Sequence, residues 1–116
     1  MVLDEAALDR LTRIGGQAFL LEMIDLFLEH APQRLATARQ AFGERDFPIV
    51  YRAAHSLKST AGNLGARELQ RTAERVEDRA AAEDGAALKT LLDELDEGYE
   101  RVRVRLEDER ARRTGP

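Results

Sequence analysis

Apolar side chains recur every three or four positions along most of the chain, which is the period of a helix with one buried face. Glycine and proline interrupt this pattern at four places: 15–16, 43–48, 62–65 and 84–85. The pattern between these interruptions predicts five helices, over about residues 4–13, 17–42, 47–61, 66–82 and 84–108. Asp4 and Asp46 stand where N-caps are expected, because a short acidic side chain can accept from free backbone N–H groups.

The connections between the four longer helices are short, and short connections place consecutive helices side by side in opposite directions. We therefore expect an all-α protein, an antiparallel up-and-down four-helix bundle with a short additional N-terminal helix. The bundle should form one domain over residues 1–109. Residues 110–116 lack apolar periodicity, so we expect this C-terminal tail to be frayed or disordered.

The composition excludes several classes of protein. Eighteen basic residues against 22 acidic ones give a net charge of −4, which disfavours a nucleic-acid partner. There is no cysteine for a disulfide or a thiolate metal site. The first ten residues already carry three acidic side chains, and no apolar run approaches membrane-spanning length, so we expect a cytoplasmic protein with no membrane role.

The third predicted helix carries one of the two histidines of the chain, His55. At about 100° per residue, Lys58, Ser59 and Gly62 lie within about 60° of this histidine on the helix surface. Two small neighbours would leave the imidazole uncovered, and Lys58 would lie near any charge placed on the ring. Spacing alone leaves another interpretation open, in which His55 only covers the edge of the apolar face. The residues predicted on that face are Phe47, Val50, Tyr51, Ala54, Leu57 and Ala61.

A specific motif surrounds His55. Residues 53–66 read AAHSLKSTAGNLGA, which closely resembles the phosphorylation motif of histidine-containing phosphotransfer (HPt) domains, A-H-x-L-K-[GS]-x-x-x-x-x-G. The resemblance extends over residues 8–106. It implies that His55 accepts a phosphoryl group on Nε2 and that Lys58 stabilises it. Ser59 stands where the family often has glycine, which leaves the site open and adds a hydroxyl.

The resemblance also places Glu77 near the histidine, where its carboxylate would hold Nδ1–H and present Nε2. A solvent-facing helix glutamate is the alternative for this residue. The implied function is that of a phosphorelay intermediate, which accepts a phosphoryl group on His55 from a receiver-domain aspartate and transfers it to another receiver domain. The other function that stays open is a non-catalytic helical scaffold or dimerisation module.

We expect a phosphocarrier rather than an enzyme, because the chain has no glycine-rich nucleotide-binding motif and the residue after the histidine, Ser56, is not an acid as in autophosphorylating kinases. No cofactor or metal site is expected in this chain, and the divalent metal, Mg²⁺, should belong to the receiver. The expected partner is the receiver domain of a response regulator or of a hybrid histidine kinase, bound by a monomer of this chain.

Two enzymatic alternatives lack their motifs. A di-iron bundle needs Glu-x-x-His pairs, but the residues three positions before His30 and His55 are Phe27 and Arg52. A serine hydrolase needs a G-x-S-x-G turn, and Ser56 is not in one.

The second predicted helix has more apolar residues than one buried stripe needs. A second apolar strip lies beside the buried stripe and ends near His30. We call it the ledge, and it consists of Phe19, Met23 and Leu26. Either the first helix covers this ledge, or part of it stays exposed as the surface that a receiver contacts. Phe19 and Leu26 are therefore candidate docking residues. If the ledge is core, the docking surface is expected around Gly62 and Arg52 on the third helix, so Arg52 is a further candidate.

Overall fold

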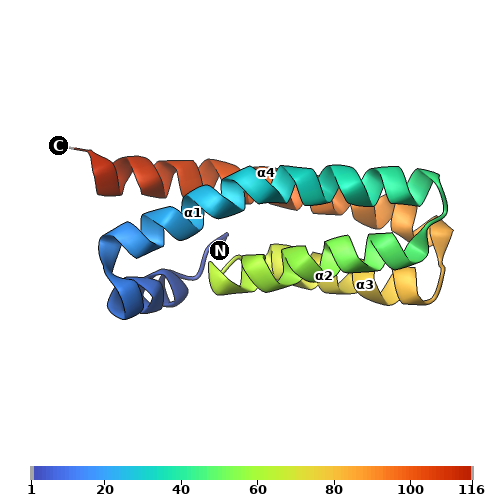
Figure 1. The fold of residues 1–116 in the computed structure, drawn as a ribbon, viewed down its shortest axis with the longest axis horizontal. Coiled ribbons are helices and arrows are strands. Elements are labelled where there is room, and N and C mark those ends of the chain that lie inside the picture. The colour runs from blue at the N-terminus through green and yellow to red at the C-terminus, as the bar shows by residue number, and fades with distance from the viewer. Residues whose placement is uncertain (1, 116) are drawn as a thin grey trace.

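The computed structural model of the chain describes residues 2–115, which form four helices. They are α1 (Glu5–Gly43), α2 (Phe47–Asn63), α3 (Arg67–Ala81) and α4 (Gly85–Thr114). Each helix packs against the next one in the chain, and α1 also packs against α4, so the four helices surround a common core (Figure 1). Connections of three residues turn the chain back after α1, α2 and α3. The expected all-helical bundle is confirmed.

Aspartates fix the starts of three helices. Asp4, Asp46 and Asp84 accept from backbone N–H groups in the first turns of α1, α2 and α4, at 3.0, 3.3 and 3.1 Å. Each bond satisfies a donor that has no partner inside the helix. Pro48 lies in the first turn of α2, where its missing N–H costs nothing.

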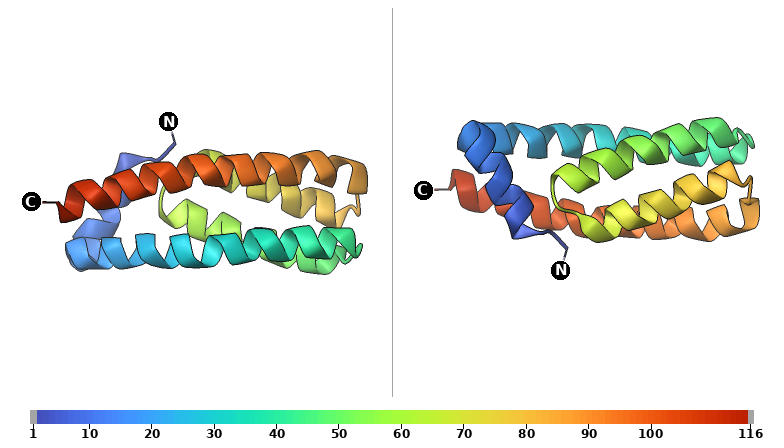
Figure 2. Two further views of the ribbon diagram at one scale, coloured as in Figure 1. Left: turned by 90° about the horizontal axis from the view of Figure 1, so that it is seen from above. Right: turned by 90° about the horizontal axis from the view of Figure 1, so that it is seen from below.

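Gly16 interrupts α1 with non-helical dihedrals of φ 86° and ψ 178°. The left-handed φ is open to glycine and strained for other residues. The segment before it, which we expected as a separate helix over 4–13, is helical and folds back across one end of the bundle (Figure 2). Leu3 and Leu8 are buried there, and Asp4 N–H donates to the Gly65 carbonyl at 2.9 Å.

The core draws large apolar side chains from all four helices. Burial of each such side chain stabilises the fold by about 1.5–3 kcal/mol. The fully buried large residues are Leu8, Leu20, Ile24, Val50, Leu57, Leu69, Val76, Leu88, Leu92, Leu95 and Leu106. No helix within residues 2–115 has the length and apolarity needed to cross a bilayer.

We expected residues 110–116 to be a frayed or disordered tail. This prediction is wrong for residues 110–114, because α4 continues to Thr114. Polar contacts hold this end in place of an apolar stripe. Arg110 Nε donates to Asp25 Oδ1 at 2.6 Å, and Arg113 Nη1 donates to Gln17 Oε1 at 3.0 Å. The buried carboxylate of Glu109 accepts from Arg113 Nε at 2.8 Å. Pro116 lies outside the described residues.

Candidate functional site: a histidine, a lysine and a buried glutamate

The apolar face of α2 determines where His55 points. Val50, Ala54 and Leu57 are buried in the core, so His55, on the flank of this face, projects from it. Its side chain is 57% exposed, and that of Lys58, one turn further along, is 28% exposed. The imidazole is therefore accessible to another macromolecule.

Glu77 reaches both residues from α3. Its side chain is only 5% exposed, so it is not a solvent-facing glutamate. Oε2 lies 3.0 Å from His55 Nδ1, and Oε1 lies 2.7 Å from Lys58 Nζ. Within residues 2–115, Oε1 has no partner besides the Lys58 ammonium. One carboxylate thus spans the seam between α2 and α3 and joins the two side chains.

The charge state of this carboxylate follows from its neighbours. Burial raises the pKa of Glu77, but hydrogen bonds from Lys58 and then His55 lower it by more, so its pKa lies below the ordinary value of 4.5. The same contact with Glu77 raises the pKa of Lys58. At neutral pH the site therefore contains an ionised carboxylate and a charged ammonium.

An ionised carboxylate can only accept hydrogen bonds, so Nδ1 of His55 must carry the hydrogen that it shares with Glu77. In the neutral ring, Nε2 then carries the free lone pair. The arrangement therefore presents a nitrogen nucleophile to solvent, with its tautomer fixed from the protein side.

The remaining neighbours of His55 are small on one side and aromatic on the other. Ser59 is exposed, and Gly62 lies against the end of the Gln70 side chain of α3, 2.7 Å from where a Cβ on Gly62 would be. Tyr51 is 39% exposed and stacks beside the His55 ring, with centroids 6.2 Å apart and planes at 7°. We expected Tyr51 on the buried face, and its i−4 spacing from the histidine was the signal that this expectation overlooked.

Comparison with known proteins places this geometry in a family. The family model of the Hpt domain matches residues 22–104. The chain belongs to the Hpt domain family. Histidine phosphotransfer in a phosphorelay is therefore the role of this Hpt domain. A crystal structure of histidine-containing phosphotransfer protein B (HptB) from Pseudomonas aeruginosa PAO1 has the same fold, with a TM-score of 0.91 and 23% identity over 96% of each chain. The comparison with curated proteins finds no match.

The residues of the predicted ledge do not share one surface in the structure of the Hpt domain: Met23 and Leu26 line a groove, and Phe19 does not. Leu26, 40% exposed, lines a groove of about 310 Å³ between α1 and α2, together with Met23 and His30. Phe19 is half-buried outside this groove, and its ring covers Gly15. On the α2 side the groove reaches Ser56, the residue after the histidine, whose hydroxyl accepts from Arg34 Nε at 3.2 Å.

Arg52, the third candidate docking residue, lies on a different face of the Hpt domain. It is exposed and lines a hollow between α2 and α3 together with Tyr51. Of the three candidate docking residues, Phe19, Leu26 and Arg52, only Leu26 lines the α1–α2 groove.

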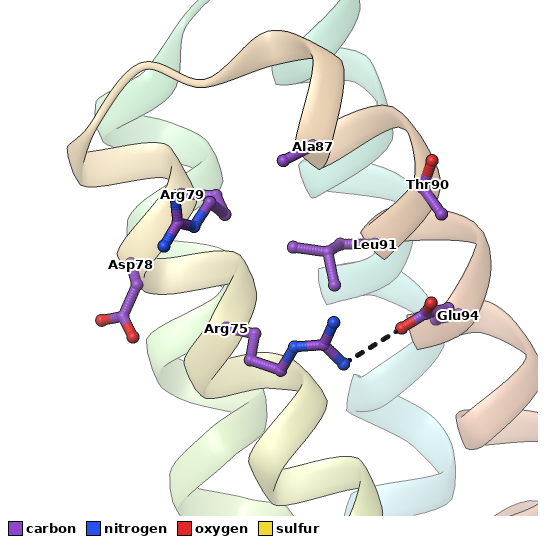
Figure 3. Close-up of a pocket in the computed structure, with 7 residues that line it drawn as sticks. All are labelled: Arg75, Asp78, Arg79, Ala87, Thr90, Leu91 and Glu94. Atoms are coloured by element: carbon purple, nitrogen blue, oxygen red, sulfur yellow. Dashed lines mark hydrogen bonds and ion pairs between the residues drawn. The ribbon is translucent and has the colours of Figure 1, made fainter.

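Another groove of the Hpt domain, about 400 Å³, lies between α3 and α4 (Figure 3). The Arg75 guanidinium donates to Glu94 Oε2 across it at 3.3 Å, and the apolar side chain of Leu91 lines its wall. Neither His55 nor Glu77 lines this groove, so it is separate from the site. Across residues 2–115 there is no group of three or more His, Asp or Glu side chains placed to hold a metal ion.

Proposed function

We propose that His55 is the phosphoacceptor of this Hpt domain. Its Nε2 lone pair attacks the phosphorus of a receiver's phosphoaspartate, forming a P–N bond as the P–O bond to the aspartate breaks. The aspartate leaves as a carboxylate, and the ring becomes cationic with a hydrogen still on Nδ1. In the onward step, the aspartate of another receiver attacks the phosphorus and His55 leaves as neutral imidazole. No proton needs to be lost in either direction.

The observation that carries this proposal is the hydrogen bond between His55 Nδ1 and the buried carboxylate of Glu77. An ionised group of opposite charge stabilises the imidazolium that forms during attack, as a carboxylate does for a catalytic histidine. Lys58 is held beside the site by the same carboxylate and would meet the negative charge of the phosphoryl group. Ser59 and Gly62 leave room for it along the helix.

We also propose that the α1–α2 groove around Leu26 is where the receiver makes contact, because it is apolar and open and it extends to Ser56 beside the histidine. In this proposal the receiver supplies the Mg²⁺, and a separate kinase supplies the phosphoryl group. The exchange takes place in the cytoplasm between a monomer of this chain and receivers of a response regulator or hybrid kinase.

The test is labelling by acetyl phosphate or by a phosphorylated receiver with Mg²⁺. We expect acid-labile, base-stable phosphate on the wild type and none on His55→Gln. His30→Gln, labelled by acetyl phosphate so that no receiver contact is involved, is the matched control, because His30 is the other histidine of the sequence, is exposed and lies on α1. Labelling that survives in His55→Gln would contradict the proposal. A wild type that no receiver labels would favour the scaffold function.

A further inference from the structure

Tyr51 and His55 form a pair of parallel rings at the surface of α2. Their centroids are 6.2 Å apart and their planes differ by 7°. This distance is within the range in which offset aromatic rings attract one another. Tyr51 is 39% exposed, so the ring is not simply part of the core. One turn of helix separates the two residues, which is the spacing that brings side chains together.

The hydrogen bond to Glu77 fixes only one atom of the imidazole. It sets the tautomer and the position of Nδ1, but the ring can still pivot about that contact and swing Nε2 along the helix surface. On the C-terminal side of the ring, Ser59 and Gly62 are too small to stop such a swing. The more than half-exposed His55 side chain has few other contacts that could do so.

Tyr51 lies where two helices meet. It lines a hollow of about 580 Å³ with Phe47 and Pro48 from the start of α2 and with Ala80 and Ala81 from the end of α3. Its ring therefore lies over the α2–α3 seam, the same seam that Glu77 spans one turn earlier in α3. A large, flat side chain thus stands on the N-terminal side of the histidine.

We infer that Tyr51 is a positioning residue for phosphotransfer: its ring limits the movement of the imidazole toward the start of α2 and keeps Nε2 directed outward. This inference rests on the proposed function, because it assigns Nε2 of His55 as the reacting atom. The face of the ring performs this role, and the phenolic hydroxyl does not. A receiver can still approach the ring from the side of Ser59 and Gly62, where the side chains are small.

The test compares Tyr51→Phe, which keeps the ring, with Tyr51→Leu, which removes the flat face. Val104→Ala is the control, because Val104 is a 56% exposed apolar residue on α4. We measure the transfer rate at saturating phosphorylated receiver, receiver affinity, thermal melting, and nuclear relaxation of the His55 ring carbons. In Tyr51→Leu we expect transfer to slow by about three- to tenfold, the equivalent of one aromatic pair. We expect faster ring motion, with affinity and melting unchanged, while Tyr51→Phe and Val104→Ala behave as wild type.

Three outcomes would overturn the inference. One is wild-type transfer and ring relaxation in Tyr51→Leu. Another is an equal loss in Tyr51→Phe, which would assign the effect to the hydroxyl. The third is a loss in Tyr51→Leu that appears entirely in receiver affinity, which would make Tyr51 a contact residue. Failure of the proposed function is distinguishable, because it would leave even the wild type unlabelled while the relaxation measurement still reports whether Tyr51 orders the ring.

Discussion

Glu77 of α3 holds His55 of α2 through the ring nitrogen opposite the one that faces solvent, at 3.0 Å. Its second oxygen is 2.7 Å from the Lys58 ammonium, so a single buried carboxylate sets the orientation of two residues one helix turn apart. Any change at Glu77 should therefore reach both the histidine and the lysine.

Replacing Glu77 with Gln should slow phosphotransfer and lower stability by about 1–3 kcal/mol, the cost of leaving buried polar groups unsatisfied. An amide has one accepting end and one donating end, so it cannot accept from both His55 and Lys58. Transfer kinetics and urea unfolding would measure the two effects. Glu74→Gln is the matched control, since Glu74 is an exposed glutamate on the same helix. Equal behaviour of the two variants would remove Glu77 from the site.

The lowered pKa of Glu77 should appear in the pH dependence of stability. A carboxyl with a lower pKa in the folded state stabilises the fold above its unfolded pKa, and this contribution is lost as pH falls through the folded value. We therefore expect the wild type to lose stability more steeply than Glu77→Gln as the pH falls below the ordinary value of 4.5. Unfolding curves between pH 7 and pH 3 would check this. Parallel curves for the two proteins would contradict the assigned direction of the shift.

Lys58→Ala should still accept phosphate on His55, but more slowly or with a shorter phosphohistidine lifetime. Loss of one charge-assisted hydrogen bond to the phosphoryl group should reduce the rate or lifetime by about tenfold. Lys89→Ala provides the control, because it removes the other lysine of the chain, which is exposed on α4. Rates and lifetimes like those of the wild type would return Lys58 to the role of a structural partner of Glu77.

The divided ledge predicts different outcomes for two substitutions on α1. Leu26→Glu should weaken receiver binding by about fivefold or more, as loss of a contact residue does, without affecting melting. Phe19→Glu should instead cost about 1–3 kcal/mol of stability, because it places a charge at a half-buried ring position. Ile14→Glu is the control, since Ile14 is 71% exposed and outside the groove.

Titration calorimetry with a receiver, together with Arg52→Ala, would identify the contacted face. If Arg52→Ala weakens binding and Leu26→Glu does not, the docking surface lies over the α2–α3 hollow rather than over the α1–α2 groove.

The parts of the fold that depend on local chemistry could be predicted from the sequence. Asp4 and Asp46 were predicted as N-caps because capping involves neighbours in the chain, and the structure confirms both. His55 and Lys58 are one turn apart on one helix, so their proximity follows from spacing alone. Tyr51 was misplaced because it lies at the edge of the apolar face, about 40° from His55 on the helix, where residue spacing alone does not decide burial.

Contacts between segments that are distant in the sequence could not be predicted from local patterns. Residue spacing alone could not bring Glu77 to His55, and only the family resemblance did so. The order of the C-terminal end depends on Arg110 meeting Asp25 and Arg113 meeting Gln17, pairs that local periodicity does not reveal. Absence of an apolar stripe was therefore a poor guide to order where arginines and carboxylates hold the helix.

The hydrogen bond from Asp4 to the Gly65 carbonyl has a consequence for the order of folding. It joins the start of the chain to the turn between α2 and α3. The chain between Asp4 and Gly65 forms a long loop, and closing this loop costs little entropy only after α2 and the turn have formed. Gly65 has φ 75°, and a Cβ there would lie 2.8 Å from the Asp4 carbonyl oxygen, so the two segments fit closely. We expect the segment before Gly16 to dock last and to detach first. Amide protons of residues 5–15 should then exchange faster than those of α2 and α3, which carry His55 and Glu77 and would stay paired while that end opens.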